Sequence, residues 1–514
     1  MAMKARRLAQ LARRYLPLAV ILLAQVLIIV LFPSTSPSTS ATASGIPTTT
    51  AATGFSTGSA GGSGNRSHCA GSREFSPTID YYAPPCTPGE INGSYASPGS
   101  TSQGVSPSTI TVVDYYADPG GAVDAIAKSE GLYVSYDQTV EVNQAFQNFI
   151  NSHYVLWGRK LKIETYRATC QTVPPDYSCL LAEMDNIVQT DQPYAVFWQS
   201  TLCSACFARL AQDHTIALGG VGFSDAFAQA SAPYFWSPGE SSTHIEQGFA
   251  RLWCNQLTSR NSDRVVSFAQ DENPAQDFNG QRRVLGVIST NDPDNEDTVS
   301  NVLIPALNSD CGDGSSVAAH HYFYSQDIGT AAQQINAGVS AMDTPSNPAT
   351  DVLCLCDPVA PLILYEGEAQ HNYWPENLLA DVQGIGSDTA AQGFESTPTE
   401  KSPACPSAPQ DSCEFDTAFG IMSSAPQGPG DGEAGPRVYH LGGGTQLPMQ
   451  PYVATAAWEA WNMLASLVEN TGPDLTPARM AAAAPSMGTI GGGTTGQAEV
   501  GFSKGSYNWT IDAR

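Results

Sequence analysis

The sequence predicts an α/β protein with two lobes, each built around a parallel central sheet. Its 514 residues exceed what one hydrophobic core usually serves, so about two to four compact units are expected. From Val105 onward, short β-branched segments alternate with segments of helical apolar spacing, which is typical of βαβ units. The alternation starts again near residue 238, which indicates a second unit of similar size.

The first unit contains four expected strands with helices between them. The strands are predicted at residues 109–113, 161–166, 195–198 and 215–218. Apolar residues at helical spacing indicate the helices, among them Val142, Phe146 and Phe149, then Leu180, Met184 and Ile187, then Phe207 and Leu210. Strands joined in this way through helices favour a parallel sheet.

The second unit and the C-terminal part continue the alternation. Strands are expected at residues 283–288, 320–323 and 351–355, and helices at 243–257, 299–307 and 330–342. The last hundred residues add strands at 419–422 and 496–502, a strong helix at 450–469, and a short helix that Thr476 caps and Pro477 begins. This part is too small for a third domain, so we expect it to pack on the first two units.

The N-terminus indicates export. Basic residues up to Arg14 precede the uncharged apolar run Leu16–Phe32, the pattern of a signal peptide or a short membrane anchor. Cleavage after Ala43 and retention as an anchor are both compatible with the sequence. Either alternative places the body outside the cytoplasm, as a secreted or tethered cell-surface protein. Residues 33–103 are rich in Ser, Thr, Gly and Pro, which predicts a flexible linker.

Cysteine usage and charge agree with an extracytoplasmic body. The chain has 12 cysteines, which outside the cytosol indicates disulfides. Sequence neighbours suggest the pairs Cys69–Cys86, Cys170–Cys179, Cys203–Cys206, Cys254–Cys311 and Cys405–Cys413, whereas Cys354 and Cys356 should point to opposite sides of a strand and stay unpaired with each other. The net charge of −26 argues against nucleic acid as a partner, because phosphate contacts need cations.

Several of these segments resemble the type I periplasmic binding proteins, most closely the branched-chain amino-acid receptors of ABC transporters. The matching segments are residues 104–112, 157–163, 282–288, 452–458, 474–477 and 496–503. The resemblance implies two Rossmann-like lobes joined by a three-crossover hinge, a ligand held between them, and a membrane permease as partner. The expected organisation is a signal or anchor at 1–32, a linker at 33–103, a first lobe at 104–237 plus 420–495, and a second lobe at 238–419 plus 496–514.

Candidate ligand contacts follow from the strand positions, because open parallel sheets bind ligands beyond the carboxyl ends of their strands. Asp114, Tyr115 and Tyr116 end the first strand, and Asn291 and Asp292 follow the first strand of the second unit. Together with the resemblance, which places a carboxylate-binding hydroxyl at Ser200 or Thr201 and an ammonium-binding acid at Asp357 or Asp381, the predicted set is Tyr115, Gln199, Ser200, Thr201, Gly220, Val221, Asp294, Asp357 and Asp381. Each acid can equally be a helix cap.

Other motifs keep alternative functions open. Cys203 and Cys206 have the spacing of thiol–disulfide oxidoreductases, although a local staple is the simpler interpretation. No cofactor motif, metal-ligand cluster or catalytic set is expected. The main hypothesis is therefore a non-enzymatic solute-binding protein for a small polar ligand, such as an amino acid or amide. The alternatives are an oxidoreductase, a ligand-sensing receptor without transport, and a scaffold that binds no ligand.

Overall fold

The computed structural model describes most of the chain from Asn65 onward. The described residues are 65–511 except 94, 96–98, 119–127, 129–132, 173–174, 199–202, 221, 259–277, 279–280, 358, 381–417, 422–433 and 492–498. The predicted export segment, the linker up to residue 64 and the pair Cys405–Cys413 therefore lie outside the described residues. Among the described helices, none has the length and apolar character that crossing a bilayer needs.

The first sheet has five parallel strands in the order β2-β1-β3-β4-β5. They are β1 Thr109–Tyr116, β2 Lys160–Arg167, β3 Ala195–Trp198, β4 Ile216–Gly219 and β5 Phe235–Trp236. In the register of the central pair, Val112 of β1 lies beside Ala195 of β3. Strands β2 and β3 lie on opposite sides of β1, so the strand order reverses between β1 and β3. Open parallel sheets bind ligands beyond the strand ends at such a reversal point.

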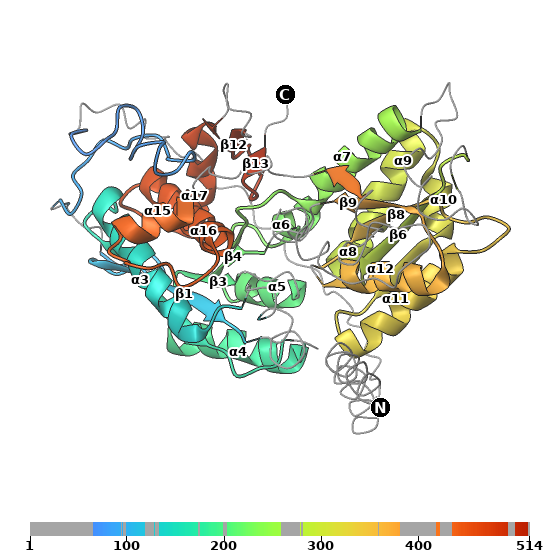
Figure 1. The fold of residues 1–514 in the computed structure, drawn as a ribbon. Coiled ribbons are helices and arrows are strands. Elements are labelled where there is room, and N and C mark those ends of the chain that lie inside the picture. Colours follow the sequence, from blue (N-terminus) through green and yellow to red (C-terminus); the bar gives the residue numbers. More distant parts are fainter. Residues whose placement is uncertain are drawn as a thin grey trace, which may run out of the picture. The chain divides into compact units, whose positions relative to one another are not determined.

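Helices cover both faces of this sheet (Figure 1). One core contains apolar side chains of α3 Tyr136–His153, α15 Ala434–Leu441, α16 Pro451–Thr471 and α17 Pro477–Ala483. The other core contains those of α4 Tyr177–Thr190, α5 Ser204–Gln212 and α6 Asp225–Ala230. The C-terminal helices α15, α16 and α17 therefore contribute to the core of the first sheet, and α16 is largely buried in it.

The second sheet repeats the arrangement with the order β10-β9-β8-β6-β7, again fully parallel. Its strands are β6 Leu285–Thr290, β7 His321–Tyr324, β8 Asp351–Leu355, β9 Glu376–Ala380 and β10 Phe419–Ile421. One face is covered by α11 Ile328–Met342 and α12 Ala360–His371, and the other by α7 Ser242–Leu252, α9 Ile304–Asp310 and α10 Gly314–Ala319 (Figure 1). The shorter helical pieces are α8 Pro293–Thr298 and two π-helical turns, Trp253–Leu257 and Val299–Leu303.

These two sheets confirm the predicted fold class. Each predicted strand exists within a few residues of its expected position, and the periodicity at 450–469 corresponds to α16. The chain passes from the first sheet to the second between β5 and α7, and it returns to the first core between β10 and α15. A third crossing, which the family resemblance implies, stays a prediction.

The C-terminal residues differ from their expected place. A small antiparallel sheet joins β11 Ile490–Gly491, β12 Glu499–Gly501 and β13 Thr510–Ile511. Phe502 packs against the ring of Trp236 at the end of the first sheet, and Ser237 pairs with Asn508. These contacts belong to the first core, whereas the sequence analysis assigns residues 496–514 to the second lobe. The large aromatic surface next to β5 explains the difference.

The described residues 65–103 are packed rather than free, which differs from the linker predicted for residues 33–103. Phe75 and Ala83 are buried in the first core. Asp80 accepts hydrogen bonds from Trp458 Nε1 at 2.8 Å and from Asn462 Nδ2 at 2.7 Å, both on α16. The amino-acid composition of this segment does not predict its packing. A few aromatic residues and the buried carboxylate of Asp80 hold it against α16.

Five disulfides are formed within the described residues, four of them the predicted pairs. These are Cys69–Cys86, Cys170–Cys179, Cys203–Cys206 and Cys254–Cys311. The fifth joins Cys354 to Cys356, so the expectation that these two do not bond is wrong. Strand alternation separates side chains only within a strand, and β8 ends at Leu355. Beyond that residue the backbone turns, and the sulfur of Cys356 reaches that of Cys354.

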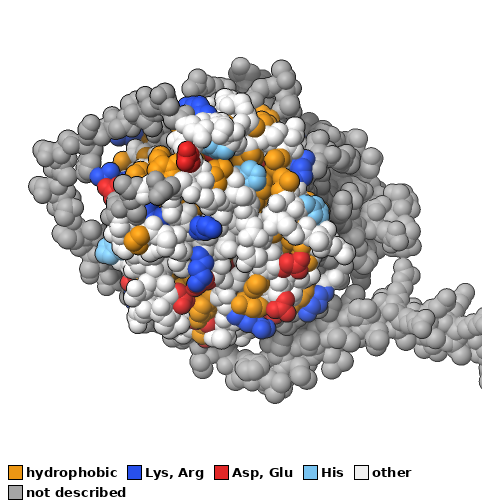
Figure 2. All heavy atoms as spheres, turned by 90° about the vertical axis from the view of Figure 1, so that its left-hand side faces the viewer, with side chains coloured by type: hydrophobic (Ala, Val, Ile, Leu, Met, Phe, Trp, Pro, Cys, Tyr) orange, Lys and Arg blue, Asp and Glu red, His pale blue; other side chains and the backbone are white. Residues whose placement is uncertain are grey.

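The exposed surface carries charges of both signs. Figure 2 shows lysine, arginine, aspartate and glutamate side chains scattered over one face of the described residues, without a large basic area. Such a surface offers few sites for a polyanion, as the net charge of −26 already indicates.

Candidate functional site

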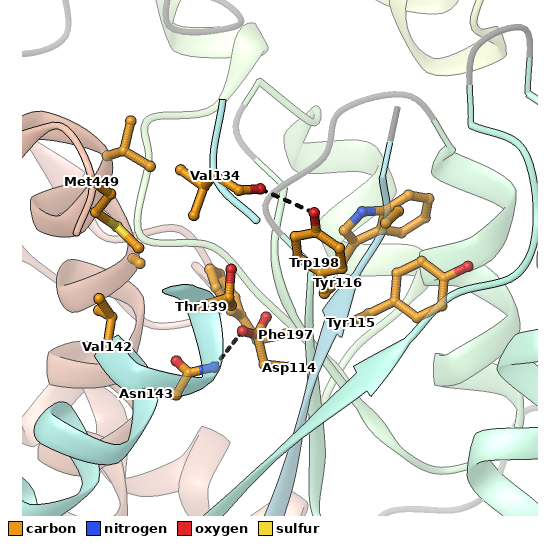
Figure 3. Close-up of a pocket in the computed structure, with 13 residues that line it drawn as sticks. Asp114, Tyr115, Tyr116, Val134, Thr139, Val142, Asn143, Phe197, Trp198 and Met449 are labelled. Atoms are coloured by element: carbon orange, nitrogen blue, oxygen red, sulfur yellow. Dashed lines mark hydrogen bonds between the residues drawn. The ribbon is translucent and has the colours of Figure 1, made fainter. Parts of the chain in front are cut away.

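A cavity of about 210 Å³ lies at the carboxyl ends of β1 and β3, where the strand order of the first sheet reverses (Figure 3). Strands β1 and β3, helix α3 and the start of α16 supply most of its walls. The lining residues are Asp114, Tyr115, Tyr116, Ala117, Val134, Thr139, Val142, Asn143, Phe197, Trp198, Met449, Val453 and Ala457. Apolar and aromatic walls with a few polar groups are typical of small-molecule sites.

Helix α3 is fixed at its start, and this positions one wall of the cavity. Ser135 and Gln138 form a capping box, so the first turn is well defined. The Gln138 amide also donates to the carbonyl of Pro448, which holds the segment before α16 against α3. Thr139, one turn into the helix, and Met449, next to Pro448, therefore face the same space.

Asp114 supplies the carboxylate of the cavity. Its side chain is 6% exposed, and Oδ2 accepts a hydrogen bond from Asn143 Nδ2 at 2.5 Å. Asn143 also donates to Thr165 Oγ1 at 3.0 Å, which fixes the amide orientation. Burial raises the pKa of Asp114 to about 6, partly opposed by the Asn143 bond. The carboxylate is therefore mainly ionised at neutral pH and accepts few hydrogen bonds. A hydrogen-bond donor of a ligand would stabilise it.

Aromatic side chains form the opposite part of the wall. The hydroxyl of Tyr116 donates to the carbonyl of Val134 at 3.0 Å, and this bond joins β1 to the segment before α3 at the wall of the cavity (Figure 3). The ring of Tyr115 lies against that of Trp198, with centroids 4.8 Å apart. The hydroxyl of Tyr115 bonds to the buried carboxylate of Glu183, and its ring packs in the core of the other sheet face, so Tyr115 only borders the cavity.

The predicted site residues separate into three groups. Tyr115 lines the cavity, together with its neighbours Asp114 and Tyr116. Gly220, Asp294 and Asp357 are described but lie elsewhere. Gln199, Ser200, Thr201, Val221 and Asp381 lie outside the described residues, so their roles stay predictions. Sequence reasoning did not select Asn143, Phe197, Trp198 or the α16 residues, whose only signal was their position on the inner faces of predicted strands and helices.

Gly220 and Asp357 have structural roles. Gly220 has φ +68°, and a Cβ there would lie 2.3 Å from the Phe223 ring, so the position requires glycine. The carboxylate of Asp357 accepts from the Val359 and Ala360 amides at 2.9 and 3.2 Å and from the Tyr324 hydroxyl at 2.6 Å. These bonds match the helix-cap alternative for this acid, because they satisfy free N–H groups at the start of α12.

Two acids of the second lobe contact the first lobe directly. Asp292 accepts from the Ser204 hydroxyl at 3.0 Å, at the start of α5. Asp294 accepts from the Ser224 amide at 2.8 Å and also from the Ser224 hydroxyl. Both carboxylates are buried, and they connect the segment after β6 to the segments after β3 and β4. Strand-end groups of one lobe thus bind strand-end groups of the other.

This contact should strengthen as pH falls. Burial raises the pKa of Asp294 to about 6 from 3.8, with smaller contributions from Asp292 and Asp297 and against the hydrogen bonds from Ser224, and burial also raises the pKa of Asp292. Because the pKa of Asp294 is higher when the lobes are in contact than when they are apart, the protonated carboxyl favours contact at low pH. This stabilisation of the contact is lost as the pH rises through about 6. Between pH 7.5 and 5 the contact should become more favourable by on the order of 1 kcal/mol. The measurement is the fraction of molecules with the two lobes together, followed by energy transfer between a fluorophore on each lobe.

The Asp294→Asn variant tests this assignment. It keeps the shape of the side chain but removes its titration, so most of the pH dependence of the contact should disappear. Glu366→Gln is the matched control, because Glu366 is an exposed acid on α12 of the same lobe and does not contribute to the pKa shift of Asp294. An unchanged pH profile in Asp294→Asn would show that another group governs the contact.

One group of described side chains has the composition of a metal site. His68, Cys69, Glu74 and Cys86 place their ligand atoms within 4.8 Å of one another. The two cysteines are joined in a disulfide, and His68 Nε2 lies 2.8 Å from Glu74 Oε1. Because metals bind thiolates and the disulfide has none, the bonded form offers only two good ligands.

Solved structures of binding proteins are similar to this chain. A possible leucine/isoleucine/valine-binding protein from Rhodopirellula baltica SH 1 is 11% identical, with 81% of this chain and 94% of that chain covered and a TM-score of 0.49. An ABC transporter solute-binding protein from R. palustris, in complex with 4-hydroxybenzoate, is 9% identical, with 78% and 90% covered and a TM-score of 0.46. An ABC transporter substrate-binding protein from Desulfitobacterium hafniense, in complex with Leu, is 13% identical, with 79% and 95% covered and a TM-score of 0.45.

No protein-family model and no curated protein sequence matches the chain. The two parallel sheets of equal strand order agree with the fold that the sequence resemblance implies. At identities this low, the ligand has to be argued from the chain's own residues.

Proposed function

We propose that this chain is an extracytoplasmic solute-binding protein that captures a small polar ligand by closure of its two lobes. The observation that carries the proposal is the cavity at the β1/β3 reversal point, with the Asp114 carboxylate facing aromatic walls. Asp292 and Asp294 of the second lobe contact residues that follow β3 and β4, so the two lobes meet at the same strand-end edge of the first sheet that holds the cavity. Delivery to an ABC-type membrane permease is part of the proposal, and a sensing role uses the same motion.

The compartment is proposed from the cysteines and the N-terminus. Five disulfides among the described residues fit an oxidising environment. The basic and apolar N-terminal pattern supports export, either with cleavage or with retention as a membrane tether. A tethered form would keep the binding protein near its permease.

The contacts of Cys203 and Cys206 favour binding over thiol–disulfide exchange. Both cysteines are 0% exposed and bonded to each other. Exchange requires attack by an external thiolate on an accessible sulfur, which this burial prevents. Their disulfide instead anchors the start of α5, where Ser204 meets Asp292.

A ligand screen by thermal shift tests the proposal. A ligand at 100 times its dissociation constant stabilises the native state by about 2.7 kcal/mol, which a melting curve resolves readily. The screen should include amino acids, amides, ureas, small peptides, aromatic carboxylates and organic amines. Absence of any hit in this set would contradict solute capture of the proposed kind.

A cavity-filling variant then locates the site. Ala457 lines the cavity, and Ala457→Phe should abolish the thermal shift of any hit because the ring occupies the ligand volume. Ala456→Phe, one residue earlier and outside the lining, is the matched control and should retain the shift. Retention of binding in Ala457→Phe would move the site away from this cavity.

A further inference from the structure

We infer that the cavity selects a small organic cation, such as a primary or quaternary amine, rather than an amino acid held through its carboxylate. This inference rests on the proposed solute-binding function and names the ligand class of the same site. It depends on the charge of the lining, on the aromatic faces, and on the occupancy of the anion-binding donors between the lobes.

The charge of the lining favours a cation. Asp114 carries the one carboxylate among the 13 lining residues, and none of these residues is Lys, Arg or His. Asn143 is the hydrogen-bond donor found for Asp114, which leaves the carboxylate with spare acceptor capacity. An anionic ligand would meet like charge here, whereas an ammonium group would complete the hydrogen bonding of Asp114 in a site of low dielectric constant.

The aromatic faces supply the second half of a cation site. Tyr116 and Phe197 line the cavity, and Figure 3 shows the Tyr116 ring near the Asp114–Asn143 pair. Trp198 borders the cavity, but its ring stacks on Phe207 in the core of the other sheet face. The faces of aromatic rings are electron-rich and attract ammonium groups. A carboxylate next to aromatic faces binds methylated ammonium groups through charge and their apolar surface at the same time.

The described hydrogen-bond donors at the rim between the lobes already bind carboxylates of the protein. At the rim between the lobes, Ser204 donates to Asp292, and the amide and hydroxyl of Ser224 donate to Asp294. The second lobe thus supplies its own carboxylates to the described donors after β3 and β4. A ligand carboxylate that used Ser204 or Ser224 would have to displace a buried, hydrogen-bonded aspartate, which gives no net gain in hydrogen bonds.

The cavity volume of about 210 Å³ lies below the range of roughly 300–1,000 Å³ that is common for ligand pockets, so a probe with few heavy atoms is the suitable first choice. Choline has seven heavy atoms and combines a quaternary ammonium group with one hydroxyl, so it is a suitable probe. Its isostere 3,3-dimethylbutan-1-ol has the same shape without the charge, and 3,3-dimethylbutanoate carries the opposite charge.

Isothermal titration of the full chain with these three probes at pH 7.5 tests the inference. We expect choline to bind at least about tenfold more tightly than the neutral isostere, and the carboxylate not to bind. Asp114→Asn should weaken choline by about 10- to 100-fold and leave the isostere unchanged. Asp118→Asn, which removes an exposed charge outside the lining, is the matched control and should change choline affinity less than about twofold.

A pH series gives a second readout that a merely structural role of Asp114 would not produce. The groups around Asp114 are the neutral side chains of Asn143 and Thr139 on α3, Phe197 on β3 and the phenols of Tyr115 and Tyr116 on β1. Burial raises the pKa of Asp114 to about 6, so wild-type choline affinity should fall below that pH as the carboxylate takes up a proton. Asp114→Asn should be insensitive to pH over this range.

The outcomes separate the two proposals. Equal binding of the neutral isostere, tighter binding of the carboxylate, or unchanged choline affinity in Asp114→Asn would overturn the cation assignment while solute binding stands. Failure of these probes together with the whole thermal-shift screen would overturn both. A folded Asp114→Asn protein, checked by its near-UV circular dichroism, that loses choline and keeps the isostere would support the inference.

Discussion

Replacing Arg283 with methionine should lower the free energy of unfolding by about 3–5 kcal/mol. The guanidinium contacts the carboxylates of Asp351 and Glu376, and both acids are 0% exposed. These three residues join the segment before β6 to the first residues of β8 and β9. Burial raises the pKa of Asp351 while Arg283 opposes this shift, so removal of the cation leaves two buried acids facing each other without compensation.

The neighbouring arginine is the matched control for this prediction. The side chain of Arg282 is 72% exposed and lies 3.4 Å from Asp313. Arg282→Met should therefore change the free energy of unfolding by less than about 1 kcal/mol, as is usual for surface ion pairs. Urea titration of both variants measures the difference, and the triple variant Arg283→Met, Asp351→Asn, Glu376→Gln should recover part of the loss. Equal midpoints for the two single variants would mean that the buried cluster does not stabilise the second lobe.

Trp458→Ala should destabilise the protein by about 3–5 kcal/mol, for a different reason. Trp458 is fully buried on α16, with ring centroids 5.5 Å from Phe146 and 5.3 Å from Phe149 of α3. Its indole nitrogen donates to Asp80 at 2.8 Å. The truncation opens a cavity in the first core and removes a donor from a buried carboxylate whose pKa is already raised by burial. Unfolding by urea, followed by circular dichroism, measures the loss.

Trp458→Phe separates packing from hydrogen bonding. Phenylalanine keeps most of the aromatic contact but has no N–H, so this variant should lose only about 1–3 kcal/mol. Residues 65–103 should also become more sensitive to proteolysis in both variants, because Asp80 holds that segment on α16. If Trp458→Ala were no less stable than Trp458→Phe, the packing part of this account would fail.

The fold was largely readable from local patterns. The β-branched run at Thr109, the apolar spacing of α3 and the stripe of α16 each reflect one face turned to a core, and such periodicity is written in consecutive residues. Two of the elements that were not predicted have little periodicity. Strand β5 has two residues, and the apolar side chains of α12 do not form a stripe at helical spacing.

The site was less readable. Tyr115 and its neighbours could be proposed because they end a recognisable strand. In the sequence, Asn143 looks like an ordinary polar residue of an amphipathic helix, and Met449 lies in a segment between two elements. Only the folded structure shows that both line the cavity with Asp114. Asp294 shows the same limit, because its sequence position suggested a ligand contact and the structure gives it Ser224 instead.

The sequence by itself determined the alternating α/β elements, four disulfide pairs and the acidic character of this protein, because each depends on residue type and spacing along the chain. The tertiary structure alone decided that Asp114 faces aromatic rings in a cavity and that Asp292 and Asp294 fill the donors of the opposite lobe. The physical reason is the strand order. Parallel strands distant in sequence become neighbours only when the sheet assembles, and their carboxyl ends then bring together side chains that no local pattern connects.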